Sequence, residues 1–159
     1  MISPDWCRMM AAYNSEMNRR LYGAADGLDA VVREADGGAF WGSIQGTLCH
    51  LLWGDTTWMS RFDGWEKPSV GMKQSPAMIQ DWAELKARRV AADQKIGSWA
   101  AGLTAENLAA PIAWHSAIIG RDVSMPLWIA AGHFFNHQTH HRGQAHALLT
   151  RAGAATGDT

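Results

Sequence analysis

Residues 126–153 read PLWIAAGHFFNHQTHHRGQAHALLTRAG. One helical face recurs through this stretch at steps of three and four residues. Its members are Leu127, Ala130, Ala131, Phe134, His137, His141, Ala145 and Leu148. Proline is favoured where a helix begins and glycine just past its end, which fits Pro126 and Gly153. The stretch predicts a long amphipathic helix that carries two histidines on its apolar face.

Three further stretches share this period, at about residues 4–27, 44–63 and 76–102. Each follows a serine that can cap a helix: Ser3, Ser43 and Ser75. After Ser3 and Ser75 a proline occupies the favoured first helical position. Arg89 interrupts the apolar stripe of the third stretch. With residues 126–153, these stretches predict an all-α protein built as a four-helix bundle.

The connections between these helices carry turn and loop signals. Gly37-Gly38 favours a loop within residues 28–42, and residues 65–74 lack any period. Residues 111–123 contain short runs typical of β-strands around Gly120-Arg121, which predict a two-stranded excursion before the last helix. No repeat or linker divides the chain. We expect one domain over residues 1–153 and a frayed tail over residues 154–159.

Composition excludes several classes of function. The 14 Lys+Arg are scattered against 15 Asp+Glu, so no basic face indicates nucleic acid or a membrane surface. No apolar run approaches the length of a membrane span. Cys7 and Cys49 are far apart and are interpreted as reduced buried thiols. We expect a soluble cytoplasmic protein whose nine Trp contribute strongly to its packing.

His137 and His141 are candidate metal ligands. Residues four apart on a helix lie one turn above each other on the same face, so two imidazoles can meet at one ion. Both interrupt an apolar face, and a buried imidazole needs a partner for its ring nitrogens. A hydrogen-bonded pair of core histidines would give the same pattern. His133 lies one turn before His137 and offers an alternative pair.

A catalytic metal site usually has three protein ligands, and His50 is the best third candidate. It lies in the apolar sequence 47–52, TLCHLL, while His115 competes from an irregular region. The motif H-E-x-x-H is absent, which excludes a zincin-type protease. No carboxylate occurs between Asp122 and Asp158. Asp55 is therefore the nearest candidate base by sequence. An aspartate would be equally expected at this position if it were only an exposed polar residue of the second helix.

Two segments carry a family resemblance. Residues 42–52, GSIQGTLCHLL, with Asp55, Trp58 and Arg61-Phe62, resemble the first histidine segment of the DinB/YfiT-like family. Residues 136–144, NHQTHHRGQ, are similar to its N-H-x-x-x-H-R-G-Q box. The resemblance implies an up-down-down-up bundle and a divalent metal site formed by three histidines. Carried over to this chain, the ligands are His50, His137 and His141.

The resemblance also implies functions. Some relatives are transferases that use low-molecular-weight thiols such as bacillithiol or mycothiol, and many relatives form dimers. A mycothiol-dependent maleylpyruvate isomerase belongs to a branch with glutamate at the position of His137, so this chain departs from the isomerase branch at a ligand position. We therefore expect a metal-dependent thiol transferase and, from that resemblance, a homodimer. The alternatives are a non-catalytic metal-binding stress-response protein and a metal-free, dimeric interaction module.

Further residues could support a metal site at these histidines. All-nitrogen ligands favour zinc or nickel over magnesium or calcium. Asn136 or Gln144 could orient a ligand histidine or the substrate, and His133 could line the pocket. Arg142 could hold a substrate carboxylate or be a surface cation. Gly143 is interpreted as a site of close helix packing. The expected partners are a small-molecule substrate and a thiol.

Overall fold

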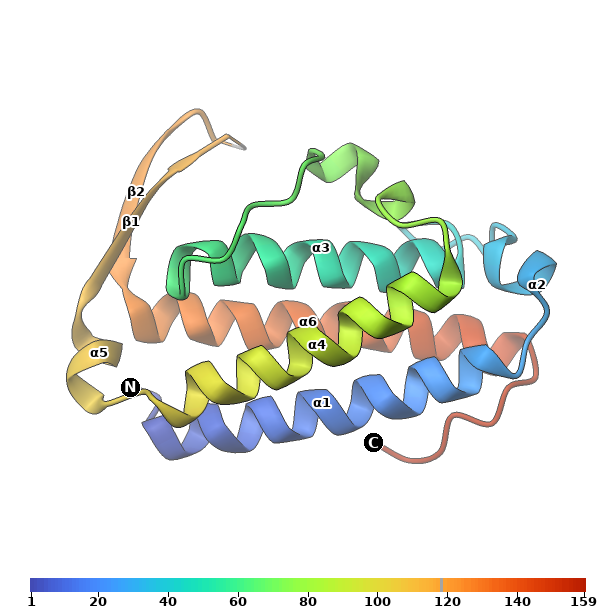
Figure 1. Ribbon diagram of the computed structural model, residues 1–159, viewed down its shortest axis with the longest axis horizontal. Coiled ribbons are helices and arrows are strands. Elements are labelled where there is room, and N and C mark those ends of the chain that lie inside the picture. The colour runs from blue at the N-terminus through green and yellow to red at the C-terminus, as the bar shows by residue number, and fades with distance from the viewer. Residues whose placement is uncertain (118) are drawn as a thin grey trace.

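The periodic stretches form four long helices in the computed structural model, which describes residues 1–117 and 119–159 (Figure 1). They are α1 (Pro4–Asp26), α3 (Ile44–Phe62), α4 (Trp82–Ala101) and α6 (Leu127–Arg151). The shorter elements are α2 (Ala30–Glu34), the 3-10 helix η1 (Met72–Ala77), α5 (Ala105–Ala109), β1 (Pro111–Ser116) and β2 (Arg121–Pro126). Within the described ranges, no helix is both long and apolar enough to cross a lipid bilayer.

The bundle has the up-down-down-up arrangement that the resemblance implies. In Figure 1, α1 and α6 run in one direction, and α3 and α4 run in the other. Because α3 and α4 are consecutive but parallel, the chain must return along the bundle between them. Residues 63–81 make this return over α3, and η1 packs against that helix. The return segment therefore lies beside α3 along much of its length.

The first two predicted helix starts are confirmed, and the third is wrong. The Oγ atoms of Ser3 and Ser43 accept hydrogen bonds from the backbone N–H groups of Trp6 and Gly46. In contrast, α4 begins at Trp82, with Asp81 as its cap. Ser75 lies in η1, where its hydroxyl donates to the carbonyl of Met72 at 2.6 Å and so does not cap a helix.

The predicted excursion before the last helix is a two-stranded antiparallel hairpin formed by β1 and β2. His115 lies opposite Asp122 in its register, and the Nδ1 atom of the exposed imidazole is 2.8 Å from the carboxylate. At the other end of the chain, Thr156 contacts His146, and Arg20 donates to the carbonyl of Asp158 at 2.8 Å. These contacts bring Thr156 beside α6 and Asp158 beside α1, and the fraying of residues 154–159 stays a prediction.

A buried polar network joins all four long helices. Arg89 of α4 lies 2.6 Å from Asp55 of α3 and 2.8 Å from Asp93, one turn further along α4. Gln138 of α6 donates to Asp55 at 2.9 Å, and Asn18 of α1 donates to Asp93 at 3.0 Å. All five residues are buried. Burial raises the pKa of both carboxyls, and the charge of Arg89 opposes that shift.

This network separates two apolar clusters of the core. One cluster includes Leu48, Leu85 and Leu148, and the other includes Met59, Ile96 and Phe134. Asp55 on α3 and Gln138 on α6 each lie, in sequence, between residues of one cluster and residues of the other. Apolar contacts alone allow helices to slide or rotate with little change in energy, whereas hydrogen-bonded charges require one alignment.

We predict that Arg89→Met lowers the free energy of unfolding by about 3–5 kcal/mol, because it leaves two carboxylates buried without their cation. The neighbouring Arg88→Met is the matched control, since Arg88 forms an exposed ion pair with Glu84. Its effect should stay within about 1 kcal/mol. Urea unfolding at neutral pH measures both values, and equal effects of the two substitutions would contradict a structural role for Arg89.

Candidate metal centre

Three histidines from two helices converge at one point. His50 comes from α3, and His137 and His141 come from α6. Each offers a ring nitrogen, and these three atoms all lie within 4.8 Å of one another. His50 and His141 are 2% and 7% exposed, and His137 is partly buried. Among the described residues, this is the one group of three or more His, Cys, Asp or Glu side chains with such spacing.

The hydrogen bonds around His50 fix its tautomer. Its Nδ1 atom lies 2.7 Å from the hydroxyl oxygen of Ser75. That hydroxyl already donates its proton to the carbonyl of Met72, so it must accept from His50. His50 therefore carries its proton on Nδ1, and Nε2 keeps a free lone pair. Metal-binding histidines commonly have this second hydrogen bond, which sets both tautomer and ring orientation.

Gln144 fixes His141 in the same way. The Oε1 atom of Gln144 lies 2.8 Å from Nδ1 of His141. A carbonyl oxygen can only accept, so His141 also carries its proton on Nδ1 and presents Nε2 as a lone pair. The amide nitrogen of Gln144 lies 3.3 Å from a ring nitrogen of His140, one turn before it on the helix. Gln144 was predicted to support a ligand histidine, and in the structure it forms a hydrogen bond with His141.

His137 lies against a glycine of α3. A Cβ atom added to Gly54 would be 2.6 Å from Cε1 of His137, closer than real Cβ contacts. Glycine at this position therefore allows the imidazole to approach the α3 backbone. The Nδ1 atom of His137 is buried and has no hydrogen-bond partner among the described residues. A buried ring nitrogen without a protein partner fits a place for a metal ion or an ordered water.

Burial keeps the three imidazoles neutral. It lowers the pKa of His50 to about 3, with smaller contributions from His141 and His137. It also lowers the pKa of His137 to about 3, and it lowers the pKa of His141 against the opposing hydrogen bond to Gln144. Only a neutral imidazole has the lone pair that coordinates a metal.

Aromatic rings enclose one side of the cluster. Trp41 stacks on His50 with ring centroids 3.8 Å apart, and Trp53 lies 5.5 Å from the same imidazole. The indole N–H of Trp53 donates to the carbonyl of Val70 at 2.8 Å, which ties the return segment to α3. Sequence reasoning missed Trp41, Gly54 and Ser75. Nine Trp signalled large aromatic contacts, but no pattern indicated which of them face a histidine.

Asp55 and Arg142 lie in different surroundings from the histidine cluster. Asp55 is fully buried, and its oxygens contact Arg89 and Gln138. A carboxylate with these partners has a structural role in the bundle. Arg142 is also buried, on the α1 side of α6, where its guanidinium lies 3.3 Å from the Thr139 hydroxyl and 5.6 Å from the Tyr13 ring.

The remaining predicted supporting residues are exposed. Asn136 donates to the carbonyl of Gly132 on its own helix at 2.9 Å. His133 lies beside Trp58, with ring centroids 5.0 Å apart, and its ring centroid is 6.0 Å from that of His137. His133 is thus a neighbour of the cluster without belonging to it. The hairpin residue His115 is not part of the cluster either.

We predict that the metal-free protein loses stability as the pH falls below about 6.5, the ordinary pKa of an unfolded histidine. Because the pKa of His50 is about 3 in the folded state, only the unfolded chain takes up this proton just below that pH. The loss should approach about 1.4 kcal/mol per pH unit for this residue. In His50→Leu, urea unfolding in EDTA should show a shallower pH dependence than the wild type. Parallel slopes would contradict a buried neutral His50.

Comparisons with known proteins agree with this architecture. Residues 4–159 match the DinB family. A crystal structure of a DinB-like protein from Bacillus cereus ATCC 10987 has 20% sequence identity and a TM-score of 0.57 to this chain. The match covers 98% of this chain and 96% of that one. A comparison with curated proteins finds no match. The chain, with its three-histidine cluster between α3 and α6, belongs to the DinB family.

Proposed function

We propose that this protein binds one divalent transition-metal ion through His50, His137 and His141 and uses it in a thiol-transfer reaction on a small electrophile. The main support for a metal site is a pair of hydrogen bonds, from Nδ1 of His50 to Ser75 and from Nδ1 of His141 to Gln144. These bonds leave an Nε2 lone pair on both histidines. Two core histidines that merely bonded each other would not need these outward anchors.

The ligand set favours zinc or nickel. Imidazole nitrogen suits these ions, whereas magnesium and calcium prefer oxygen ligands. Structural zinc normally has four protein ligands, and a set of three leaves a position for a water or a substrate. The burial of His50 and His141 is the observation that favours the alternative, a non-catalytic ion that stabilises the bundle.

The surroundings of the cluster favour a thiol as the nucleophile. An ion bound here would lower the pKa of a thiol or water at its free position. The free pKa of a thiol is near 8.5, far below that of water, so a thiol needs much less activation. Asp55, the nearest candidate base by sequence, is engaged with Arg89. A nucleophile that needs no carboxylate base therefore suits this site best.

We predict that the purified protein binds one zinc or nickel ion per chain and that His50→Gln weakens this binding by more than about a hundredfold. Ser75→Ala should weaken it about 10–100-fold, because the imidazole of His50 loses its anchor. His115→Gln on the exposed hairpin is the matched control and should bind as the wild type does. Isothermal titration with each metal measures these affinities, and unchanged binding by His50→Gln would refute the ligand set.

The thiol-transfer step is tested separately on the metal-loaded protein. Bacillithiol or mycothiol is mixed with an aryl or alkyl halide, and the loss of free thiol is followed. Turnover should disappear after metal removal and in His50→Gln. Tight metal binding without turnover above background would support the non-catalytic alternative. The homodimer implied by the resemblance stays a prediction.

A further inference from the structure

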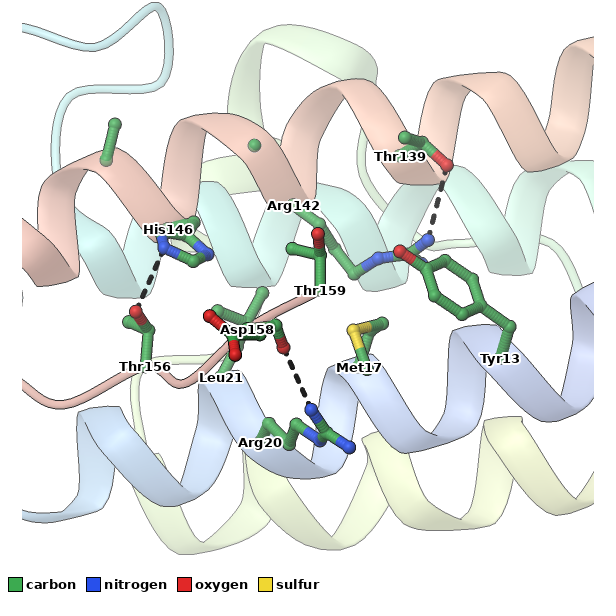
Figure 2. Close-up of a pocket in the computed structure, with 12 residues that line it drawn as sticks. Tyr13, Met17, Arg20, Leu21, Thr139, Arg142, His146, Thr156, Asp158 and Thr159 are labelled. Carbon is green, nitrogen blue, oxygen red and sulfur yellow. Dashed lines mark hydrogen bonds between the residues drawn. The ribbon is translucent and has the colours of Figure 1, made fainter.

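A cavity lies on the α1 side of α6, apart from the histidine cluster (Figure 2). Its volume is about 340 Å³, within the range of small-molecule sites. Tyr13 and Met17 of α1 line one wall, Arg142 and Gly143 of α6 line another, and the tail residue Thr156 lines a third. The histidine cluster contacts α3, so α6 presents different faces to the two sites.

Arg142 is the polar residue whose surroundings indicate a ligand-binding site in this cavity. It is 5% exposed, and its Nη1 atom is buried without a hydrogen-bond partner among the described residues. Its one hydrogen bond there runs from Nη2 to the hydroxyl of Thr139. The other deeply buried guanidinium, Arg89, has two carboxylates, whereas Arg142 forms no ion pair with any described residue. A buried cation of this kind is costly unless an anion joins it.

Gly143 follows Arg142 on α6 and also lines the cavity. The prediction that this glycine allows close helix packing is wrong, because a Cβ atom built on it would meet nothing within 4 Å. Glycine inside a helix destabilises it relative to alanine, so its place in the middle of α6 is not explained by packing. Gly143 is exposed and lines the cavity, so a larger side chain at this position would extend into open space at its edge.

The remaining walls define the chemical class of the occupant. Tyr13, Met17 and Leu21 present mostly apolar surface, and the lining also includes the acidic residue Asp158 and Arg20, which donates to the backbone carbonyl of Asp158. Figure 2 shows the side chain of Arg142 extending from α6 toward Tyr13. A ligand that pairs with Arg142 would place one negative group on its guanidinium and an apolar body along α1.

We propose that this cavity binds a small organic carboxylate, whose anionic group pairs with Arg142 and whose apolar part packs on Tyr13 and Met17. The guanidinium offers a planar pair of N–H donors that matches a carboxylate. Burial lowers the pKa of Arg142, and a bound anion would oppose that shift. The proposal does not depend on metal binding at the histidines.

The test uses phenylacetate and its neutral counterpart phenylacetamide as probes. Binding is followed by NMR of ¹³C-methyl methionine, with the Met17 signal assigned from Met17→Leu, on metal-free and on zinc-loaded protein. Phenylacetate should shift the Met17 methyl saturably in both forms and bind at least about tenfold more tightly than the amide. Arg142→Met should remove this preference for the acid.

Gly143 offers a matched pair of variants that leaves the guanidinium intact. Gly143→Leu should fill the cavity and abolish binding, whereas Gly143→Ala should retain it, and both should keep a stable α6 because alanine and leucine favour helices. Equal affinities for acid and amide, undiminished binding to Gly143→Leu, or no shift of Met17 at about 10 mM probe would each overturn the proposal. A shift seen only with zinc bound would assign the probe to the histidine site and also overturn it.

Discussion

The ion pair of Arg89 with Asp55 and Asp93 is the constraint on which the rest of the structure depends. It connects α3 with α4, and the amides of Asn18 and Gln138 extend it to α1 and α6. Charges buried this deeply are tolerated only when they are paired and hydrogen-bonded. The bundle therefore has one alignment of its four helices in which this network is satisfied, with apolar clusters on either side of it.

The same network positions the histidine cluster. Asp55 lies five residues after His50 on α3, and Gln138 lies between His137 and His141 on α6. The hydrogen bond from Gln138 to Asp55 thus fixes the two helices that carry all three imidazoles. The return segment forced by the parallel α3 and α4 adds Ser75, which orients His50. The fold and the candidate metal centre depend on the same interactions, because the contacts that align the helices also bring the three imidazole rings together.

Much of this could be predicted from sequence, because it depends on local periodicity. The long helices, the hairpin and the two histidines on one face of α6 are all visible as patterns of nearby residues. Asp55 is different, since its partner Arg89 is 34 positions away and pairing across helices leaves no periodic signal. The interruption of the third apolar stripe by Arg89 was the one trace of this network. Ser75 followed by Pro76 has the chemistry of a helix start, and only the packing of η1 on α3 shows that its hydroxyl serves His50 instead.

Anomalous X-ray diffraction from crystals grown with zinc tests the central claim most directly. Data collected on both sides of the zinc absorption edge identify the ion and its position without reference to activity. The account predicts one peak per chain, about 2.0–2.1 Å from a ring nitrogen of each of His50, His137 and His141. A peak elsewhere, or no peak with the three rings hydrogen-bonded to one another, would contradict it.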